Sequence, residues 1–225
     1  MRIYAVSCNE GRATRLLSSA EPLELFIDIE IVTSPLGTDE EVVRRGKTCF
    51  ERDSAYPTGL AATLGHMRAM RRLVDSGDRM AMIVEDDVRF HKDFQRRCAI
   101  VAANMEGVDV FTTGYVNFPY GTEEDVGGLK VIKNVQLGNP WGAQGYVITA
   151  EYAARFLSIF EADDLSGPYS YKFVTDCVIF DPVLGCRRHT LVDPIVVEDP
   201  DEQTLAGNNN KPPLFGRLTR NDYWF

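Results

Sequence analysis

The stretch MIVEDDV, residues 82–88, ends an apolar run with three adjacent carboxylates. The residues before them, 81–84, are all apolar, which predicts a strand covered on both faces, as in a parallel sheet. Ligands of open parallel sheets bind beyond the carboxyl ends of the strands. Glu85, Asp86 and Asp87 therefore mark a sheet edge at which a binding site is expected.

Two of these carboxylates are candidate metal ligands. If the backbone stays extended, Glu85 and Asp87 project to one side and Asp86 to the other. Carboxylate oxygens at a strand end suit a hard divalent cation such as Mg²⁺ or Mn²⁺, which would hold the phosphates of a nucleotide. The alternative is a solvated acidic loop, or a helix N-terminus capped by Asp87.

Strands and helices alternate along the first half of the chain. The β-rich segments predict strands at 2–8, 25–35, 80–84 and 108–115. The segments between them predict a turn at 9–11 followed by a short helix to residue 20, and helices at 39–46, 59–77 and 92–105. The tetrapeptide YPTG, residues 56–59, is expected to be a break before the third of these helices. The alternation predicts an α/β fold, a mostly parallel sheet with helices on both faces.

Beyond residue 116 the pattern predicts a smaller mixed or antiparallel part. The expected strands there are 129–135, 145–149 and 190–198, and the expected helices are 150–162 and a short one near 175–184. Polar, turn-rich residues predict a flexible C-terminal segment at about 199–213. We find no repeat and no second core, so we expect residues 1–225 to form a single domain.

Composition excludes several classes of protein. The 225 residues carry a formal net charge of −9, which argues against a duplex nucleic-acid binder and against docking on anionic lipid by charge alone. The chain shows no secretory signal and no apolar stretch long enough for a membrane span, so a cytoplasmic protein is expected. The 5 scattered cysteines predict neither a disulfide framework nor a zinc knuckle.

Three stretches occur in an order that is more specific than any one of them. A helix TGLAATLGHMRAM (58–70) precedes the strand and carboxylates of MAMIVEDDVRFHKDF (80–94). SCNEGRATR (7–15) lies upstream and WGAQGYVITAEYAARFL (141–157) downstream. Together with TDCVIF (175–180), this order resembles glycosyltransferase family 25 over roughly residues 5 to 180.

The resemblance is divergent at particular positions. In the helix, Gly65-His66 stands where the family has Ser-His, and Ala62 where it has Cys. The upstream stretch carries Glu10 in place of the family's Leu. The positions that match the family's pattern outside the helix are Asn9, Arg12, Arg15, Trp141, Gly145, Tyr146, Ile148, Ala153 and Leu157.

The resemblance implies a GT-A-type fold, Rossmann-like, in which the EDD is the DxD-like metal motif. The family transfers sugars, typically galactose or glucose from UDP donors, to hydroxyls of lipopolysaccharide or protein. Mn²⁺ or Mg²⁺ is the expected cofactor, held by Glu85 and Asp87, with His189 as a third ligand. Residues expected to contact the UDP-sugar are Asn9, Arg12, Arg15, Glu85, Asp86, Trp141 and Tyr146.

Each of these roles has a structural alternative. Arg12 and Arg15 follow the first strand, where they could bind a diphosphate or lie on the surface. Trp141 and Tyr146 could stack on a base or a sugar, or pack the sheet. His189 could equally be a surface histidine. These alternatives remain open from the sequence.

Two further residues carry specific hypotheses. Asp176 opens a short helix after a Gly/Pro/Tyr-rich loop, and we expect it to be the general base for an acceptor hydroxyl, with a helix N-cap as the alternative. His66 lies on the apolar side of its helix, which favours a core histidine; the resemblance makes it a support for the strand that carries the EDD.

The sequence thus predicts a metal-dependent, inverting glycosyltransferase that takes a UDP-sugar donor and a hydroxyl-bearing glycan or protein acceptor. A metal-dependent nucleotidyl- or phosphotransferase is an alternative, although the chain has no P-loop and no G-x-G-x-x-G turn. A non-catalytic nucleotide-sugar-binding module is another. The donor sugar, the acceptor and the oligomeric state stay open.

Overall fold

The computed structural model describes residues 1–23, 29–49, 56–116, 119–135, 142–160, 179–180 and 184–199. Within these residues the chain builds an eight-stranded sheet and a separate two-stranded sheet, β10-β4. The strand order of the large sheet is β2-β1-β3-β8-β5-β9-β7-β6. Its strands are β1 (Arg2–Ser7), β2 (Ile29–Thr33), β3 (Met80–Glu85), β5 (Val110–Gly114), β6 (Glu123–Val126), β7 (Leu129–Ile132), β8 (Gly145–Thr149) and β9 (Arg188–Leu191).

The large sheet is mixed but has one dominant direction. Strand β1 pairs in parallel with both β2 and β3, and β5 pairs in parallel with β9. Strand β8 lies antiparallel between β3 and β5, so these five parallel strands point the same way around it. Strands β6 and β7 add an antiparallel hairpin at the far edge. The predicted α/β class is confirmed, including its smaller antiparallel part.

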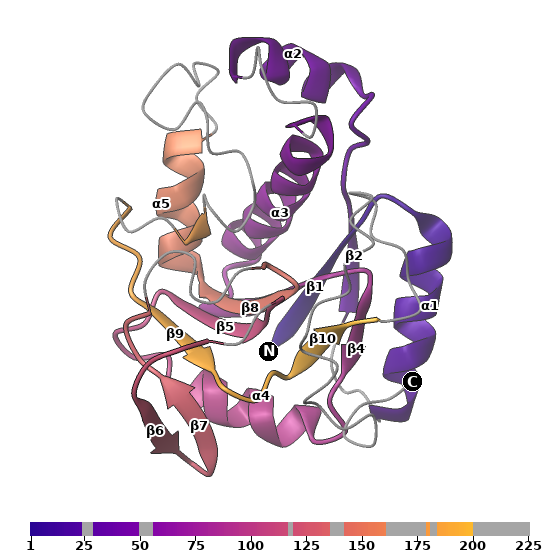
Figure 1. Ribbon diagram of the computed structural model, residues 1–225. Coiled ribbons are helices and arrows are strands. Elements are labelled where there is room, and N and C mark those ends of the chain that lie inside the picture. The colour runs from indigo at the N-terminus through magenta and orange to yellow at the C-terminus, as the bar shows by residue number, and fades with distance from the viewer. Residues whose placement is uncertain are drawn as a thin grey trace.

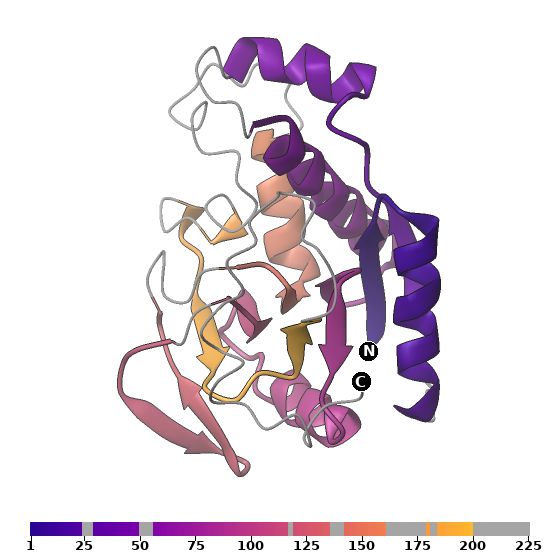
Figure 2. The same ribbon diagram turned by 45° about the vertical axis from the view of Figure 1, so that its right-hand side comes forward.

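Helices cover both faces of the sheet (Figures 1 and 2). Helices α2 (Glu40–Cys49), α3 (Tyr56–Ser76) and α5 (Ala150–Phe160) pack on one face, with Val42, Leu73 and Phe156 in the same apolar cluster as Ile83 of β3. Helices α1 (Glu10–Ala20) and α4 (Phe94–Ala103) pack on the other. Their buried residues share a cluster with the remaining β3 side chains; they include Leu16, Phe94 and Val101.

Strand β3 lies in the middle of this arrangement. Its residues alternate between the two clusters: Ala81 and Ile83 face α3, and Met82 and Val84 face α1 and α4. All four side chains are fully buried. The prediction of a strand covered on both faces is therefore confirmed, and this covering explains why residues 81–84 are all apolar.

The predicted break at YPTG is wrong. Residues 56–59 form the first turn of α3, which begins at Tyr56. Proline is tolerated there because the first backbone N–H groups of a helix have no partner within the helix. The helix ends as predicted, with Gly77 at φ 76° accepting the left-handed conformation of a helix C-terminus.

The segment 190–198 forms two strands and not one. β9 ends at Leu191, and after Pro194 the chain leaves the large sheet as β10 (Val196–Glu198). β10 pairs antiparallel with β4 (Val88–Phe90), a short strand between the carboxylates and α4. The sequence had indicated only a helix after the carboxylates, so β4 is an element that it did not predict.

Several predictions fall outside the described residues. Trp141 and Asp176 are among these positions, as are most of the short helix expected near 175–184 and all but the first residue of the segment 199–213. The single-domain assignment stays a prediction. Among the helices that the structure describes, none combines the length and the apolar character that crossing a membrane would require.

Candidate functional site

The three carboxylates lie at the point where β3 leaves the sheet. The strand ends at Glu85, whose N–H donates to the carbonyl of Gln144 at 3.1 Å, and Asp86 and Asp87 form the turn into β4. The extended alternation therefore stops at Glu85. Asp86 and Asp87 both contact Arg12, whereas Glu85 faces His66 on the α3 side. The prediction that Glu85 and Asp87 share one side, opposite Asp86, is wrong because the backbone turns between them.

Arg12 provides the counter-charge for this turn. It lies in the first turn of α1 and is 5% exposed. Its Nη2 donates to Asp87 Oδ2 at 2.8 Å, and its Nε lies 3.4 Å from Asp86 Oδ1. Ser7, at the end of β1, donates to the other oxygen of Asp86 at 2.5 Å. Asp86 and Asp87 are thus held from β1 and α1 before any ligand is bound.

The neighbouring residues of α1 have separate positions. The Asn9 side chain caps the helix, with Oδ1 accepting from the Arg12 N–H at 3.1 Å. Arg15 is exposed on the same helix, one turn further on. The structure therefore brings Asn9 and Arg12 to the carboxylates, while Arg15 lies on the outer surface beside them.

One oxygen of Asp87 has no hydrogen-bond partner among the described residues. The side chain is 12% exposed, and its Oδ1 is buried and unpaired although Oδ2 receives Arg12. Burial, and then the charge of Glu85, raise the pKa of Asp87 to about 8 despite the opposing effect of Arg12. A buried carboxylate with an unpaired oxygen is costly, and a bound cation would relieve that cost.

A divalent cation fits this arrangement in a limited way. No group of three or more metal-binding side chains occurs within the described parts of the chain. Mg²⁺, however, commonly takes only one or two carboxylates and completes its coordination with water and substrate phosphates. Asp87 Oδ1 and Glu85 are candidates for that mode, because Glu85 is near enough for its charge to raise the pKa of Asp87 and, among the residues described, no arginine pairs with Glu85 or with Oδ1 of Asp87.

His66 supports Glu85 from beneath. Its ring is fully buried in α3, with Nδ1 2.8 Å from the Tyr146 hydroxyl and Nε2 3.5 Å from Glu85 Oε1. The close approach of α3 depends on Gly65, since a Cβ there would lie 2.6 Å from both Ser34 Oγ and Val6 Cγ1. The glycine that departs from the family's serine therefore has a packing cause in this chain.

Tyr146 belongs to the core. It is fully buried on β8, and its ring stacks on His66 at 5.7 Å and contacts the edge of Phe180. Burial, and then the charge of Glu85, raise its pKa well above the usual range. A ring without exposed surface cannot stack on a base or a sugar, so the packing alternative describes Tyr146.

His189 lies away from the carboxylates. It pairs in register with Phe111, which pairs with Val147, which in turn pairs with Met82 of β3. His189 is therefore three strands across the sheet, about 14 Å at the usual strand spacing. Its Nδ1 accepts from a backbone N–H at 3.4 Å, and burial lowers its pKa. The structure does not bring His189 to Glu85 and Asp87.

The β4–β10 pair brings two acidic residues to this site, Glu198, which the sequence offers as an alternative base, and Asp199, which it did not single out. Glu198 lies opposite Val88, and the N–H of Asp199 donates to the Asp87 carbonyl at 2.6 Å. Asp199 also pairs with Arg89 at 2.6 Å. β10 thus fixes the backbone of the turn and places Glu198 beside Asp87, whose pKa it helps to raise. The pairing is non-local, so no local pattern could have indicated it.

Two glycines let β10 approach. Val196 lies so close to Gly114 of β5 and Gly145 of β8 that a Cβ at either position would collide with its Cγ2. The side chains of Val196 and Glu198 point to the same side of β10, because strand residues alternate. Glu198 is therefore directed toward the same edge as the carboxylates of the turn.

No protein-family model matches the chain, and a comparison with curated proteins finds no match. Among solved structures, it is similar to a glycosyltransferase involved in the glycosylation of the major capsid of PBCV-1 (TM-score 0.45, 11% identity, 90% of this chain and 93% of that chain). It is also similar to S. aureus TarS 1-349 (TM-score 0.43, 13% identity, 88% of this chain and 60% of that chain). A third similar structure is mannose-1-phosphate geranyltransferase from Thermus thermophilus (TM-score 0.44, 12% identity, 86% of this chain and 73% of that chain). These likenesses are distant, so the function of this chain is argued from its own residues.

Proposed function

We propose that this protein is a metal-dependent, inverting glycosyltransferase that moves a sugar from a UDP-sugar to a hydroxyl of a glycan, lipopolysaccharide or protein. The observation that carries the proposal is the buried, unpaired Oδ1 of Asp87 at the carboxyl edge of the parallel strands. A ligand that brings a cation and phosphates to that edge would complete it. The order of stretches that resembles glycosyltransferase family 25 supports the choice of a sugar donor.

The carboxylates would hold the cation. Glu85 and Asp87 would bind Mn²⁺ or Mg²⁺, which when present supplies positive charge for the leaving diphosphate. Arg12 and Ser7 hold Asp86 and the turn in place. The buried ring of His66 lies against Glu85, with Nε2 3.5 Å from Oε1 and without a hydrogen bond between them. Because these groups are fixed before binding, the site requires little rearrangement when a donor binds.

The acceptor must lose a proton as it attacks the anomeric carbon. Asp176 remains our candidate base for that proton, and Trp141 our candidate for stacking on the donor; both lie outside the described residues. The attacking oxygen forms a bond to the anomeric carbon while the bond to the diphosphate breaks, so the configuration inverts. Asn9 and Arg15 remain candidates for contacts with the donor phosphates.

Donor binding tests the proposal without knowledge of the acceptor. UDP-sugars with Mn²⁺ should raise the free energy of unfolding by ~2.7 kcal/mol at 100 times the dissociation constant. Asp87→Asn should remove the metal-dependent part of this stabilisation. The matched control is Asp75→Asn, at an exposed position on α3, which should behave like the wild type. Stabilisation that is absent with every UDP-sugar in the presence of Mn²⁺ would reject the donor assignment.

Product analysis separates the alternatives. Release of the free sugar and UDP indicates glycosyl transfer to water, whereas release of the sugar phosphate and UMP indicates cleavage within the diphosphate. Binding without turnover would favour the non-catalytic module. That outcome has a structural motive, since Arg12 already occupies oxygens of Asp86 and Asp87.

Asp176→Asn tests the proposed base. The transfer rate at saturating donor should fall ~10²–10⁴-fold, while donor affinity stays nearly unchanged, because a base contacts the acceptor. If Asp176 is a helix cap, asparagine should replace it with little loss of rate. In that case Glu198 is the next residue to test, because β10 places it beside Asp87.

A further inference from the structure

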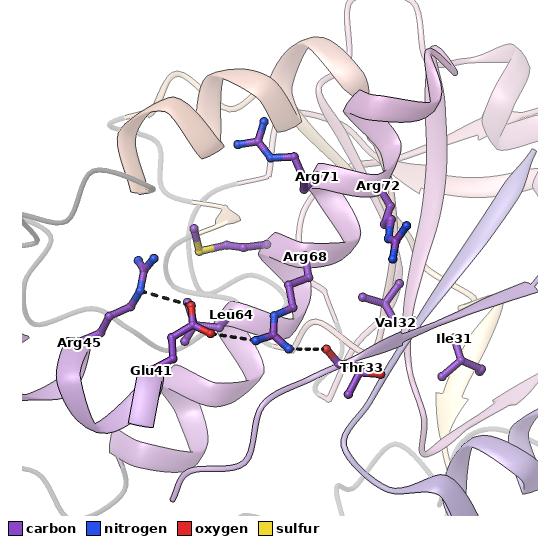
Figure 3. Close-up of a pocket in the computed structure, with 10 residues that line it drawn as sticks. Ile31, Val32, Thr33, Glu41, Arg45, Leu64, Arg68, Arg71 and Arg72 are labelled. Carbon is purple, nitrogen blue, oxygen red and sulfur yellow. Dashed lines mark hydrogen bonds and ion pairs between the residues drawn. The ribbon is translucent and has the colours of Figure 1, made fainter. Parts of the chain in front are cut away.

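A pocket lies on the opposite side of α3 from the carboxylates. It has a volume of about 410 Å³ and is formed by β2, α2 and α3 (Figure 3). Among the described residues that line it, four are arginines and one, Glu41, is acidic; the arginines are Arg45, Arg68, Arg71 and Arg72. This concentration of positive charge contrasts with the net charge of −9 of the whole chain.

Two acidic side chains pair with three of the pocket arginines, and each is either shared or lies outside the lining. Glu41 is shared, with Arg68 Nη2 at 2.8 Å and Arg45 Nε at 3.6 Å. Arg72 lies 3.5 Å from Glu30, which is outside the lining. The side chains of Arg68 and Arg72 are 44% and 66% exposed, so their pairs are weak and an incoming anion can compete for them.

One arginine is held in place by the sheet. Arg68 Nη1 donates to the Thr33 carbonyl of β2 at 2.9 Å. The N–H of Ser34, in the same peptide unit, donates to the Ser7 carbonyl of β1 at 2.7 Å, so the Thr33 carbonyl faces away from β1. Figure 3 shows Arg68 between Glu41 and Thr33, which fixes one side of the guanidinium fork. A positioned guanidinium loses less side-chain entropy on binding an oxyanion than a free one would.

The floor of the pocket is apolar. Val32 of β2 and Leu64 and Met67 of α3 line it, and all three are buried. An inorganic ion would use only the arginines. A ligand with an apolar surface and an anionic group would use both the floor and the rim, as small-molecule sites commonly do. A sugar ring that carries a phosphate or a carboxylate has this combination.

The pocket and the carboxylates occupy neighbouring parts of one sheet edge. Thr33 pairs in register with Ser7 of β1, and Ser7 donates to Asp86. Two strand spacings, about 10 Å, therefore separate the pocket from the end of β3. Helix α3 lies between them, with His66 directed to the carboxylates and Arg68 to the pocket. An extended saccharide could reach both.

We propose that this pocket binds an anionic sugar unit, with its phosphate or carboxylate on the arginines and its ring on the apolar floor. It is a subsite for an acceptor glycan that carries negative charge. The saccharide part of this proposal rests on the proposed glycosyltransferase function. The anion site itself rests on the pocket and its charges.

Calorimetric titration tests the subsite on the whole protein. The probes are glucose 6-phosphate, glucuronate, glucose and inorganic phosphate. Glucose 6-phosphate or glucuronate should bind the wild type, and the double variant Arg71→Gln/Arg72→Gln should lose ~10-fold or more in affinity, as expected for lost charge-assisted contacts. Both residues are exposed, so the variant should fold. The matched control is Arg96→Gln, an exposed, ion-paired arginine of α4 on the other face of the sheet, which should bind like the wild type.

The outcomes are distinct for each part of the proposal. Tighter binding of the sugar anions than of phosphate, with weak binding of glucose, supports an anionic sugar. Equal affinity for inorganic phosphate overturns the saccharide part, and no binding of any anion overturns the site. An equal loss of affinity for the sugar anions in the Arg96→Gln control also overturns the site. If UDP with Mn²⁺ binds nowhere while glucose 6-phosphate still binds, the proposed function fails and the subsite stands.

Discussion

The carboxylate turn and the arginine pocket lie on opposite sides of α3 and hold their charges in opposite ways. In the turn, Asp86 and Asp87 are nearly buried and share the buried guanidinium of Arg12. In the pocket, Arg68 and Arg72 are exposed and pair with acidic side chains that are themselves partly exposed. The ion pairs of the turn therefore interact more strongly than those of the pocket, because burial removes the solvent that screens the charges.

The difference teaches what each region is suited to do. The turn is pre-organised, and its buried charges fix a geometry that a ligand must match. The pocket is adaptable, since exposed arginines can exchange one anionic partner for another at little cost. A donor diphosphate needs the first property, and a variable anionic glycan needs the second. The experiments that follow test this contrast in stability before any activity is assayed.

The largest expected effect is at Arg12. Arg12→Ala removes the buried partner of two carboxylates and should lower the free energy of unfolding by ~3–5 kcal/mol, the usual cost of breaking a buried pair. Urea denaturation at a pH above the Asp87 pKa of about 8 measures it, because both carboxylates are charged there. The corresponding change in the pocket, Arg68→Ala, should cost no more than about 1 kcal/mol. Equal costs at Arg12 and Arg68 would contradict the contrast.

The second expected effect is a pH dependence from Asp87. Its pKa in the folded protein is about 8, above the ordinary 3.8 of the unfolded chain. The folded state therefore keeps a proton that the unfolded state releases, so this contribution to stability is fully present below about pH 4 and is lost as pH rises through about 8. Without a cation, stability should fall across this range by an amount on the order of 2–5 kcal/mol.

Asp87→Asn checks this assignment. The variant should show a flatter dependence of the free energy of unfolding on pH than the wild type. Mn²⁺ at pH 8 should stabilise the wild-type protein but not the variant. Asp75→Asn, at an exposed position, should keep the wild-type slope. A slope that survives in Asp87→Asn would assign the pH dependence to other groups.

The third expected effect concerns the support beneath Glu85. His66→Ala leaves the buried Tyr146 hydroxyl without its partner and should cost ~1–3 kcal/mol. Tyr146→Phe removes the same hydrogen bond from the other side. If the two act through one contact, the double variant should cost less than the sum of the singles. Unchanged stability with lost turnover in His66→Ala would place His66 in the chemistry.

The smallest expected effect is in the pocket itself. Arg72→Gln should change the free energy of unfolding by less than ~0.5 kcal/mol, because the residue is 66% exposed and its pair with Glu30 is long. Raising the ionic strength should lower the affinity of the pocket for a sugar anion, because its arginines are exposed and screened by salt. The buried ion pairs of the carboxylate turn should be screened less, so the stability that thermal unfolding measures should change less between low and high ionic strength. A strong loss of stability in Arg72→Gln would mean that the pocket arginines maintain the fold.

The elements that the sequence predicted correctly are those with local causes. The two-sided apolar run of β3 and the apolar side of α3 are written in consecutive residues, so periodicity alone reveals them. The three-residue strands β4 and β10 have no such pattern, and each exists because the other pairs with it. For the same reason the alternation expected for extended backbone at residues 85–87 does not occur, because the structure has a turn there that Asp199 closes.

Site residues follow the same division. Asn9 and Arg12 were indicated by the resemblance, and Arg12 also because it follows the first strand. The structure places both at the carboxylates, and their contact with a donor stays a prediction. For Tyr146 the sequence left open stacking on a ligand or packing in the sheet, because burial depends on what covers β8 and this cannot be read from its own segment. His189 required the strand order, since only the pairing of β9 with β5 reveals its distance from β3.

The antiparallel strand β8 has a consequence for how the chain folds. It comes late in the sequence, at Gly145–Thr149, yet it separates β3 from β5. A nascent chain that ends before β8 therefore has β3 with an unpaired edge, and β5 cannot substitute, because the two strands are not neighbours in the finished sheet. Such long-range pairing slows folding. We expect β3 and β8 amides to gain hydrogen-exchange protection together, in one late step, while the β1–β2 pairing can form during synthesis.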